Sequence, residues 1–286
     1  MRIGVSGAGG HVGAATMAEL LRRAPEHELV AITRTPARVA SPAVGRFGDY
    51  DRPETLVTAY AGLDRLLIIP SADLRPGVRG AQGIAAIDAA VAAGVGHIVL
   101  LSATGTRAKA EPAIGAAYWV AEQRLLRGDA TGWTILRMNY FGETLAEEAR
   151  LSLGRGVLTG LAENRVAYVS REDVATAAAG SLVGDGHIGA IYNLTGPASV
   201  SGAERAAMIA DASGAPLSFA ILTDAQLRGG LTQAELPAYA IDALASMQAS
   251  LADGAYDIVT GDVEKLSGRA PRPLRGVLED WSWPSP

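Results

Sequence analysis

The feature that most constrains the fold is a short apolar segment, residues 2–6, which runs directly into a glycine-rich turn and then into a helical pattern. Gly7 permits the tight turn, Gly10 lets the backbone approach a ligand closely, and Gly13 lets the helix pack near the strand. The helix begins at about His11 and Val12, where free N–H groups and the helix dipole favour a bound anion. An ordinary glycine-rich turn is the alternative, but the strand before it and the amphipathic helix after it favour a pyrophosphate-binding turn.

Apolar segments and helical patterns alternate through the first two-thirds of the chain. The candidate strands are residues 2–6, 29–33, 65–70, 97–102 and 133–137, with a weaker strand near 44–47. They lack period-two alternation, which is typical of strands buried on both faces of a parallel sheet. Between them, Ile84, Ile87 and Val91 form one helical stripe that ends before Gly94. This alternation predicts an α/β fold with a doubly wound parallel Rossmann sheet.

The last third of the chain has clear helix starts but fewer strands. Ser170 with Asp173, Ser201 with Glu204, and Thr223 with Gln226 have the spacing of capping boxes. Residues 191–194 and 217–222 are candidate strands, and 227–251 are mostly helical. We therefore expect an NADP-binding Rossmann domain over 1–141 and a smaller C-terminal α/β cap domain over 142–286. Segments near 166–196 are expected to return to the main sheet.

Composition excludes several kinds of function. The chain has 286 residues, of which 49% are hydrophobic and 19% charged, so it can bury a substantial core. A net charge of -5 provides no basic surface for nucleic acid. The absence of cysteine removes disulfides, thiolate metal sites and a thiol nucleophile, and the four histidines have no metal-ligand spacing. We expect a small-molecule substrate and no metal, while homo-oligomerisation stays open.

No segment of the sequence resembles a membrane anchor or a secretory signal. The apolar start runs into glycines instead of a signal-peptide core. No uncharged apolar run approaches the roughly 20 residues that span a bilayer. The expectation is a cytoplasmic protein.

The end of the second candidate strand indicates which dinucleotide binds. An acidic residue about 20 residues after the glycine turn would bind the ribose 2′-hydroxyl of NAD. This chain has Arg34 and Arg38 there and no acid. A guanidinium can bind a 2′-phosphate through two hydrogen bonds and stack on adenine, so the sequence predicts NADP(H). Two solvated surface arginines are the alternative.

Side chains at the carboxyl ends of the other strands are candidates for the remaining contacts. After the third strand, Asp49 and Tyr50 are expected beside the adenine, although Asp49 fits equally well as the cap of the next helix. The fourth strand ends at Ile69, Pro70 and Ser71, which should pass the nicotinamide ribose.

Two further strand ends are expected at the reacting end of the site. Ser102 provides a hydroxyl near the nicotinamide. Asn139, Tyr140 and Phe141 are candidate substrate contacts, with the aromatic rings forming a wall for a flat molecule. Packing between the two domains is the alternative for these rings.

A tyrosine followed four residues later by lysine is the catalytic pair of short-chain dehydrogenases, and this chain lacks it. The residues four positions after the eight tyrosines are Glu54, Asp64, Glu122, Thr144, Glu172, Gly196, Ala243 and Thr260. Tyr118 lies in the right region but has Glu122 at that spacing, and a carboxylate does not favour a phenolate. Tyr118 is therefore a candidate hydrogen-bond donor and a poor general base.

These motifs resemble the NmrA-like group of atypical short-chain dehydrogenases, in particular its bacterial NADPH-dependent quinone reductases and triphenylmethane reductases. The likeness runs along nearly the whole chain and includes the glycine turn and the segments 34–38, 48–50, 66–71, 122–126, 134–137, 192–196 and 259–268. It places Glu122 among the residues on the cofactor side. Family members often have histidine where Tyr118 stands and asparagine where Met138 stands, so this chain departs from the pattern at the substrate end.

The resemblance implies an NADPH-binding Rossmann domain, a small C-terminal domain, and a cleft between them in which hydride donation depends on positioning. The main hypothesis is an oxidoreductase that reduces a quinone-like or other conjugated small molecule. The alternative is a non-catalytic NADP(H)-sensing regulatory protein of the NmrA type. A reductase or isomerase of a specialised biosynthetic pathway also fits the sequence.

Overall fold

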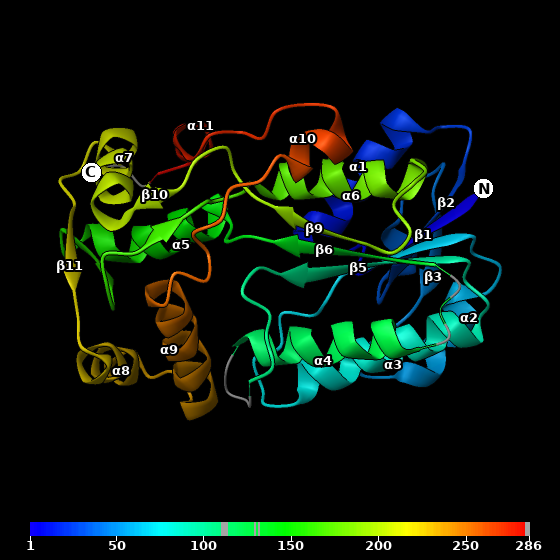
Figure 1. Cartoon of the computed structure of the whole chain (residues 1–286), viewed down its shortest axis with the longest axis horizontal. Coiled ribbons are helices and arrows are strands. Elements are labelled where there is room, and N and C mark those ends of the chain that lie inside the picture. Colours follow the sequence, from blue (N-terminus) through cyan, green and yellow to red (C-terminus); the bar gives the residue numbers. More distant parts are fainter. Residues whose placement is uncertain (110–113, 129, 131, 284–286) are drawn as a thin grey trace.

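A seven-stranded, wholly parallel β-sheet forms the centre of the protein (Figure 1). The computed structural model describes residues 1–109, 114–128, 130 and 132–283. In spatial order the strands are β3 (Val44–Phe47), β2 (Glu28–Thr33), β1 (Arg2–Ser6), β4 (Arg65–Ile68), β5 (His97–Ala103), β6 (Trp133–Met138) and β9 (Ala190–Leu194). The predicted strands and the doubly wound α/β fold are confirmed, and the weak strand at 44–47 has the predicted bounds.

The order of the strands reverses at β1. The chain moves outward from β1 through β2 to β3, then returns to pair β4 with the other edge of β1 and continues outward to β9. Two connections therefore leave the carboxyl end of the sheet in opposite directions on either side of β1. Ligands of open α/β sheets bind in the crevice that forms at such a point.

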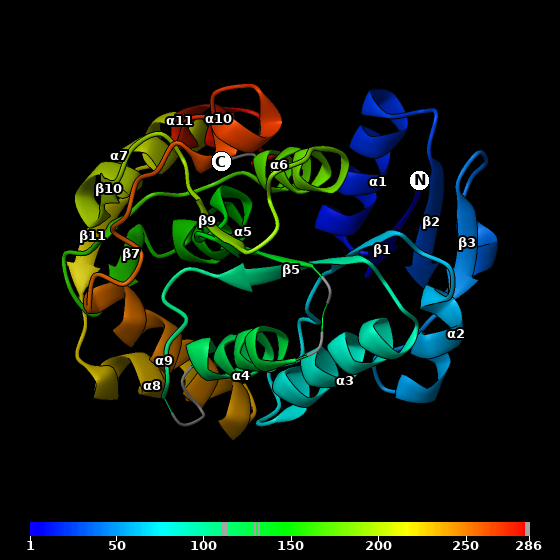
Figure 2. The ribbon, with the colours of Figure 1, turned by 45° about the vertical axis from the view of Figure 1, so that its right-hand side comes forward.

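Helices cover both faces of the sheet, as Figures 1 and 2 show. One face carries α1 (His11–Arg23), α6 (Arg171–Val183) and α10 (Asp262–Ser267), and the other carries α2 (Leu56–Tyr60), α3 (Val78–Ala92) and α4 (Ile114–Arg127), with the short 3-10 turns η1 (Pro36–Arg38) and η2 (Pro53–Thr55). Both faces of β5 are buried: Val99 and Leu101 pack in the α1–α6 layer, and Ile98 and Leu100 in the α2–α4 layer. This two-sided burial explains why the strands lack period-two alternation.

A smaller cluster of elements lies beyond the carboxyl ends of β6 and β9 (Figure 1). It comprises α5 (Gly142–Leu153), β7 (Val157–Gly160), β8 (Arg165–Val166), β10 (Val200–Ser201), α7 (Gly202–Ser213), β11 (Ser218–Ile221), α8 (Asp224–Gln233), α9 (Ala238–Ala252) and α11 (Leu274–Glu279). All of these elements except α8 contribute side chains to a hydrophobic core of their own. The amide of Ile114, at the start of α4, donates to the Ser246 hydroxyl of α9 over 3.1 Å, which ties this cluster to the main sheet's helices.

The C-terminal part contains structure that its sequence pattern does not predict. The strand expected at 217–222 is β11, and it pairs in parallel with β7, a strand that the pattern missed. The short β8–β10 pair was also missed. Ser201 and Thr223 begin their helices with complete capping boxes, as predicted. Ser170 differs in one of the two bonds. Its hydroxyl accepts the Asp173 N–H, but the Asp173 carboxylate accepts from the Ser170 hydroxyl instead of from the Ser170 backbone N–H.

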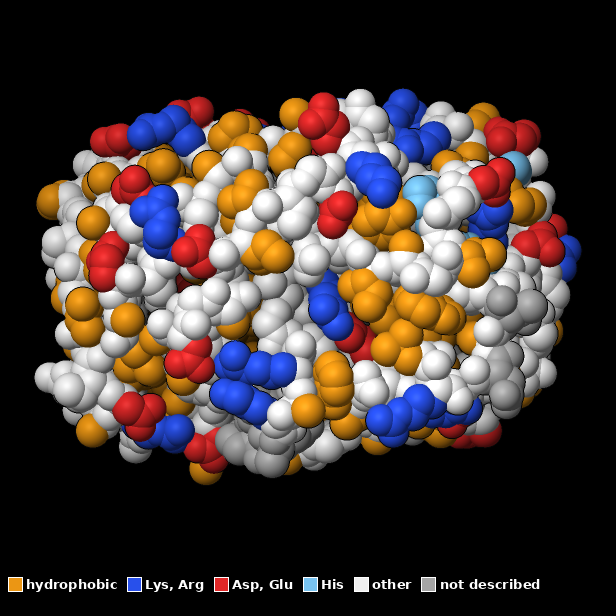
Figure 3. Space-filling model, viewed as in Figure 1, with side chains coloured by type: hydrophobic (Ala, Val, Ile, Leu, Met, Phe, Trp, Pro, Cys, Tyr) orange, Lys and Arg blue, Asp and Glu red, His pale blue; other side chains and the backbone are white. Residues whose placement is uncertain are grey.

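Within the described ranges, no helix is long and apolar enough to cross a membrane. Acidic, basic and hydrophobic side chains are interspersed over the face of the molecule in Figure 3. No cluster of three or more metal-ligating side chains occurs among the residues that the structure places.

Candidate functional site

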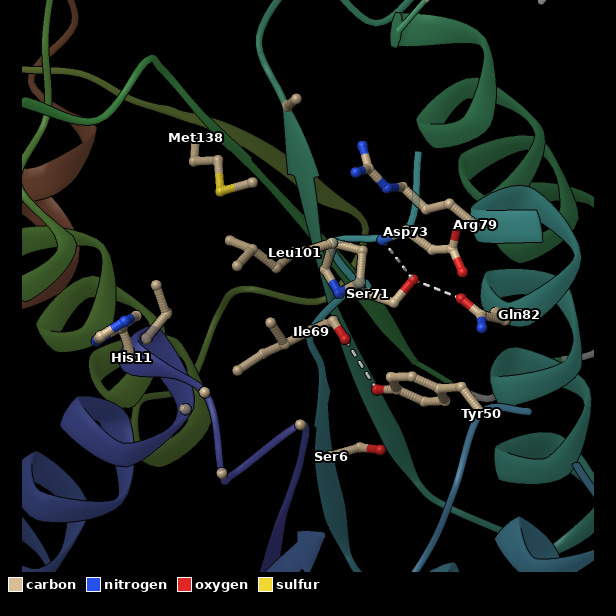
Figure 4. A pocket seen from close by; sticks show the side chains of 18 of the residues that line it. Ser6, His11, Tyr50, Ile69, Ser71, Asp73, Arg79, Gln82, Leu101 and Met138 are labelled. Carbon is tan, nitrogen blue, oxygen red and sulfur yellow. Dashed lines mark hydrogen bonds between the residues drawn. The ribbon is translucent and has the colours of Figure 1, made fainter. Parts of the chain in front are cut away.

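A cleft of about 940 Å³ opens at the carboxyl edge of the sheet, beside the strand-order reversal (Figure 4). Its walls are the glycine turn (Gly7, Gly9, Gly10, His11, Val12, Gly13), the ends of β2 and β3 (Ile32, Thr33, Arg34, Thr35, Gly48, Asp49, Tyr50, Asp51), the end of β4 (Ile69, Pro70, Ser71, Ala72, Asp73, Leu74), α3 and α4 (Arg79, Gln82, Ile114, Tyr118), the ends of β5 and β6 (Leu101, Ala103, Met138, Asn139, Tyr140, Phe141) and the C-terminal part (Thr144, Arg171, Met247, Tyr256). In Figure 4, His11 lies across the cleft from Arg79 and Gln82, with Ile69 and Leu101 between them.

The geometry of the turn explains two of the three predicted pyrophosphate-site glycines, Gly7 and Gly13, directly. Gly7 has φ +89°, a left-handed conformation that favours glycine, and its N–H donates to the Ile32 carbonyl over 3.2 Å. A β-carbon at Gly13 would lie only 2.2 Å from the Gly7 carbonyl oxygen, so this position tolerates no side chain. These contacts fix the start of α1 against the ends of β1 and β2.

Gly10 is constrained in a different way. A β-carbon there would lie no closer than 3.6 Å to the rest of the protein, yet Gly10 lines the cleft. The protein itself therefore has room for a side chain at Gly10, a residue that stands in the cleft wall. Gly10 is also the N-cap of α1 and makes no side-chain cap, so the first N–H groups of the helix are available to a ligand. This cradle fits a pyrophosphate.

The end of β2 contributes one of the two predicted arginines to the cleft. Arg34 and Thr35 line it, and no carboxylate stands at this strand end. Arg38 ends the η1 turn and is exposed, but it is not among the lining residues. Arg34 thus lies at the cleft and Arg38 lies outside its walls, and contact of either arginine with a 2′-phosphate stays a prediction.

Asp49 and Tyr50 follow β3 and border the same end of the cleft. Asp49 Oδ1 accepts the Asp51 N–H over 3.1 Å, which closes a tight turn. The N-cap of η2 is Arg52 and that of α2 is Thr55. Asp49 therefore caps neither helix, and the alternative that it caps the next helix is wrong.

Tyr50 is a rigid wall residue. Its hydroxyl donates to the Ile69 carbonyl over 2.9 Å, joining the β3 and β4 ends (Figure 4). Burial raises the pKa of Tyr50 to about 12, so its hydroxyl stays protonated at neutral pH. Tyr50 consequently shapes the cleft as a neutral side chain whose hydroxyl proton is donated to the Ile69 carbonyl.

A chain of hydrogen bonds stiffens the α3 side of the cleft. The Ser71 hydroxyl donates to the Gln82 side-chain oxygen, and the Gln82 amide donates to Asp51 over 2.8 Å. The Asp73 N–H in turn donates to the Ser71 hydroxyl (Figure 4). Ile69, Pro70 and Ser71 therefore line the cleft as expected, on a loop held from both sides.

The structure corrects the expectations for Ser102 and Glu122. Neither residue lines the cleft, and both are buried, at 1% and 0% exposure. Successive side chains of a strand point to opposite faces, and Leu101 and Ala103 are the β5 residues that face the cleft. Ser102 donates to Glu122 over 2.6 Å, and Arg137 donates to both Glu122 oxygens over 2.9 and 2.6 Å. This group fixes α4 against β5 and β6 beneath the site.

Tyr118 lines the cleft from α4, half-buried, and lies against Arg79 of α3. Arg79 Nη1 donates to the Tyr118 oxygen over 3.2 Å, and the guanidinium carbon lies 5.2 Å from the ring centroid. The Tyr118 oxygen therefore accepts a hydrogen bond from a cation, and its own proton is free to point elsewhere.

Aromatic side chains close the far end of the cleft. Tyr140 lines the cleft and also packs edge-to-face on Tyr168 and Tyr256, with ring centroids 6.0 and 6.2 Å away. Its ring therefore serves both as a wall of the cleft and in packing. Its hydroxyl donates to Glu148 over 2.5 Å. Burial, and secondarily the Glu148 charge, raise the pKa of Tyr140 far above its ordinary value. Phe141 lines the cleft beneath the Arg171 guanidinium, 5.8 Å away.

Asn139 is 2% exposed, and its side-chain amide is committed within the protein. Its Nδ2 donates to the Tyr256 carbonyl over 3.1 Å, and its Oδ1 accepts the Tyr140 N–H over 2.7 Å. Asn139 thus lines the cleft while its amide holds Tyr140 and Tyr256 in place, and a direct contact with the substrate stays a prediction.

Several lining residues have no signal in the sequence. Arg79 and Gln82 lie on α3, and the sequence of α3 shows an apolar stripe but no pattern for a binding site. Met247 and Tyr256 come from α9 and the loop after it, more than a hundred residues beyond the β6 end that they meet. Only the packing of the C-terminal core places these side chains at the cleft.

The strand-order reversal, the uncapped glycine-turn helix and the cleft beside them define a dinucleotide-binding protein of the doubly wound class. The chain belongs to the NAD(P)H-binding family, whose model matches residues 7–183. Binding of an NAD(P)H cofactor follows from this membership, as the sequence predicted.

Individual relatives cover nearly the whole chain. Quinone oxidoreductase 2 of Escherichia coli is 29% identical over 271 residues, which are 93% of this chain and 93% of the relative. The structure of the E. coli NADPH-dependent quinone oxidoreductase complexed with NADPH has a TM-score of 0.87 at 27% identity and covers 96% of this chain and 98% of that one. The Citrobacter sp. triphenylmethane reductase complexed with NADP(H) has a TM-score of 0.87 at 25% identity, covering 97% and 99%. The predicted resemblance to these two kinds of reductase is confirmed.

Proposed function

We propose that the protein is an NADPH-dependent oxidoreductase that reduces quinone-like or other conjugated small molecules. One observation carries this proposal: a single cleft runs from the glycine turn, past the ends of β4, β5 and β6, to an apolar wall of Met138, Tyr140 and Phe141. A dinucleotide bound at the turn would extend its nicotinamide toward that wall. A flat aromatic acceptor fits the remaining space.

The relatives support the same substrate class. Quinone oxidoreductase and triphenylmethane reductase are named for acceptors with extended conjugation, and both were solved with NADPH or NADP(H). Their likeness extends over the C-terminal part, which contributes Met247 and Tyr256 to the cleft.

The cofactor contacts follow from the cleft walls. We assign the pyrophosphate to the turn at Gly7, Gly10 and Gly13 with the N–H groups of His11 and Val12, and the 2′-phosphate to Arg34. Tyr50 and Ile69 border the adenosine and ribose portions. NADPH, when bound, supplies a hydride, which is two electrons and one hydrogen nucleus, and becomes NADP⁺.

Reduction in this site would depend on positioning and on excluding water. We propose that it proceeds without a Tyr-x-x-x-Lys pair, since no lysine stands four residues after any tyrosine of the chain. A quinone suits such a site because its reduced form is a stabilised phenolate that demands little from a protein acid. Tyr118 is the residue whose hydroxyl could take the hydrogen-bonding role of the tyrosine in the missing pair.

The two-part division of the chain serves the same function. We propose that residues 1–141, with the returning segments near 166–196, hold the cofactor and that the rest of 142–286 supplies the substrate side. Thr144, Met247 and Tyr256 line the cleft from that second part, which supports the division.

The test is a titration of the wild-type protein with NADPH and NADH by protein fluorescence, followed by mixing the NADPH complex with p-benzoquinone. Arg34→Gln should weaken NADPH binding about tenfold or more and leave NADH binding unchanged, because a hydrogen bond to a charged group contributes about 1.5–3 kcal/mol. Arg38→Gln is the matched control, since it removes the same charge outside the cleft, and it should have a smaller effect.

The outcomes separate the two readings of the site. Consumption of bound NADPH by the quinone supports the reductase. Tight NADPH binding without reduction of any conjugated acceptor would overturn it in favour of an NADP(H)-sensing protein. Equal affinity for NADH, unaffected at Arg34, would contradict the assigned cofactor.

A further inference from the structure

Arg79 is a buried cation at the edge of the cleft. Its side chain extends from α3 toward the carboxyl ends of the strands (Figure 4), and the residue is only 9% exposed. Its Nε atom is buried and has no hydrogen-bond partner. A guanidinium stays protonated in proteins, so its charge must be stabilised in place. Burial without such stabilisation is costly.

No carboxylate of the described residues forms an ion pair with Arg79. The nearby carboxylate of Asp73 takes its hydrogen bonds from Arg75, whose Nε donates to both Asp73 oxygens over 3.0 Å. These bonds, and to a smaller extent the charge of Arg79, lower the pKa of Asp73. The buried carboxylate of Glu122 is held by Arg137. The one side-chain group that accepts from Arg79 is the neutral Tyr118 hydroxyl. A buried cation with spare donors that faces a ligand cleft is a binding group for an anion.

The hydrogen bond between these two residues also fixes the direction of a proton. A guanidinium has donors and no acceptor, so the Tyr118 oxygen must accept from Arg79. The Tyr118 proton is then available to an acceptor other than Arg79, and Tyr118 lines the cleft. A cation and a proton donor thus converge on one region of the cleft wall.

We propose that Arg79 binds the negatively charged oxygen of the conjugated ligand and that Tyr118 donates a proton to that same oxygen. This inference rests on the proposed reductase function and deepens it. The ligands selected are those whose oxygen is anionic or becomes anionic on reduction, such as quinones and hydroxyquinones. Arg79 is a new specificity-determining residue, and it replaces the lysine of the absent tyrosine–lysine pair with a cation from another helix.

The step balances in atoms and electrons. The acceptor receives a hydride, which is two electrons and one hydrogen, from NADPH, which becomes NADP⁺. The hydride forms a bond at one end of the acceptor's conjugated system, and the π electrons move to the carbonyl oxygen at the other end. Arg79 stabilises the resulting charge through hydrogen bonds. Tyr118 gives its proton to that oxygen, so an O–H bond forms as the tyrosine O–H bond breaks, and water returns a proton to Tyr118.

A pair of probes tests the anion site without turnover. Hydroxynaphthoquinone is ionised at neutral pH, whereas methoxynaphthoquinone has nearly the same shape and no charge. Both are titrated against the NADP⁺ complex by protein fluorescence, in the wild type and in Arg79→Gln, Arg79→Lys and Arg124→Gln. Arg124 pairs with Asp88 on the outer face of α4, so its substitution removes the same charge outside the cleft.

The wild type should prefer the anionic probe, and Arg79→Gln should lower this preference about tenfold or more. Arg79→Lys should keep part of it, because the charge remains but the two-pronged geometry is lost. Arg124→Gln should keep all of it. Equal weakening of both probes in Arg79→Gln, or an unchanged preference, would overturn the inference.

Three outcomes separate this inference from the proposed function. If Arg79→Gln weakens NADP⁺ itself and not the anionic probe, the cation serves the cofactor phosphates and the inference fails. If quinones are reduced while the wild type shows no anion preference, the reductase stands and the inference alone fails. If the anion preference depends on Arg79 but no acceptor is reduced, the inference about the site stands and the reductase fails.

Discussion

The hydroxyl of Ser102 donates to the Glu122 carboxylate over 2.6 Å, on the face of β5 opposite to the one that meets the cleft. Arg137 holds both oxygens of the same carboxylate. The strand end that carries Ser102 thus presents an aliphatic surface, Leu101 and Ala103, toward the ligand and a charged network toward α4. Polar side chains that meet a ligand beside the end of β5 therefore come from other elements, among them Tyr118 of α4 and Arg79 of α3.

Glu122→Ala should destabilise the protein strongly. The substitution leaves the Arg137 guanidinium, whose side chain is 25% exposed, without its carboxylate partner. Breaking a buried pair by removing one member costs about 3–5 kcal/mol. Denaturant unfolding followed by circular dichroism measures the effect.

Asp88→Ala is the control for that substitution, because it breaks the exposed Arg124 pair, and exposed pairs contribute about 0–1 kcal/mol. Similar losses in the two variants would contradict the view that the Glu122 group holds α4 in place.

Ser102→Ala should leave cofactor affinity within about twofold of wild type, since the hydroxyl lies outside the cleft. Its loss removes one buried hydrogen bond to a charged group and should cost about 1.5–3 kcal/mol of stability. NADPH titration by fluorescence and thermal unfolding measure the two quantities on the same sample. A tenfold weakening of NADPH binding at unchanged stability would mean that Ser102 contacts the cofactor after all.

Gly10→Ala and Gly13→Ala should separate ligand binding from folding. The β-carbon at Gly13 would lie 2.2 Å from the Gly7 carbonyl oxygen, so that variant should lose both stability and NADPH binding. The β-carbon at Gly10 would have its nearest protein neighbour at 3.6 Å, and Gly10 lines the cleft. Gly10→Ala should keep its unfolding temperature and bind NADPH at least about tenfold more weakly, since the backbone can no longer approach the pyrophosphate closely.

Gly229→Ala is a matched control for both variants, because Gly229 lies in α8 with nothing within 4 Å of its β-carbon position. It should leave NADPH affinity unchanged. Unchanged NADPH affinity in Gly10→Ala would remove the glycine turn from the cofactor site.

The parts of the fold that sequence predicts are those written in local patterns. The strand β1, the left-handed Gly7 and the helix that starts at His11 form one continuous signal of about twenty residues, and the buried strands follow as apolar runs. The switch point then follows from the alternation of strand and helix, without knowledge of any long-range contact.

The parts that sequence misses depend on contacts between distant residues or on strand register. The end of β5 is predictable, but the pleat decides that Leu101 faces the cleft and Ser102 does not. In the sequence, nothing distinguishes Arg79 from an ordinary surface arginine. Its role depends on the contact with Tyr118, which lies thirty-nine residues later in the chain. The strands β7 and β11 are each four residues long and pair across sixty residues, so neither has a distinctive pattern.

His97 should make stability depend on pH between about 4 and 6.5. The residue is 6% exposed, and burial, helped by the Arg65 and His187 charges, lowers its pKa from 6.5 to about 4. Its Nε2 lies 2.8 Å from the Thr134 hydroxyl, which itself donates to the His187 carbonyl over 2.6 Å. Because that hydroxyl proton is already used, the neutral His97 ring must donate from Nε2.

The unfolded chain takes up a proton at His97 below pH 6.5, whereas the folded protein takes it up only near pH 4. The stabilisation is therefore complete above pH 6.5 and is lost as the pH falls, with a full size of about 3 kcal/mol at about 1.4 kcal/mol per pKa unit. His97→Gln retains a donor to Thr134 and does not titrate, so its free energy of unfolding should fall less between pH 7 and 4. Parallel curves for wild type and His97→Gln in denaturant titrations would show that His97 does not titrate as a buried neutral ring.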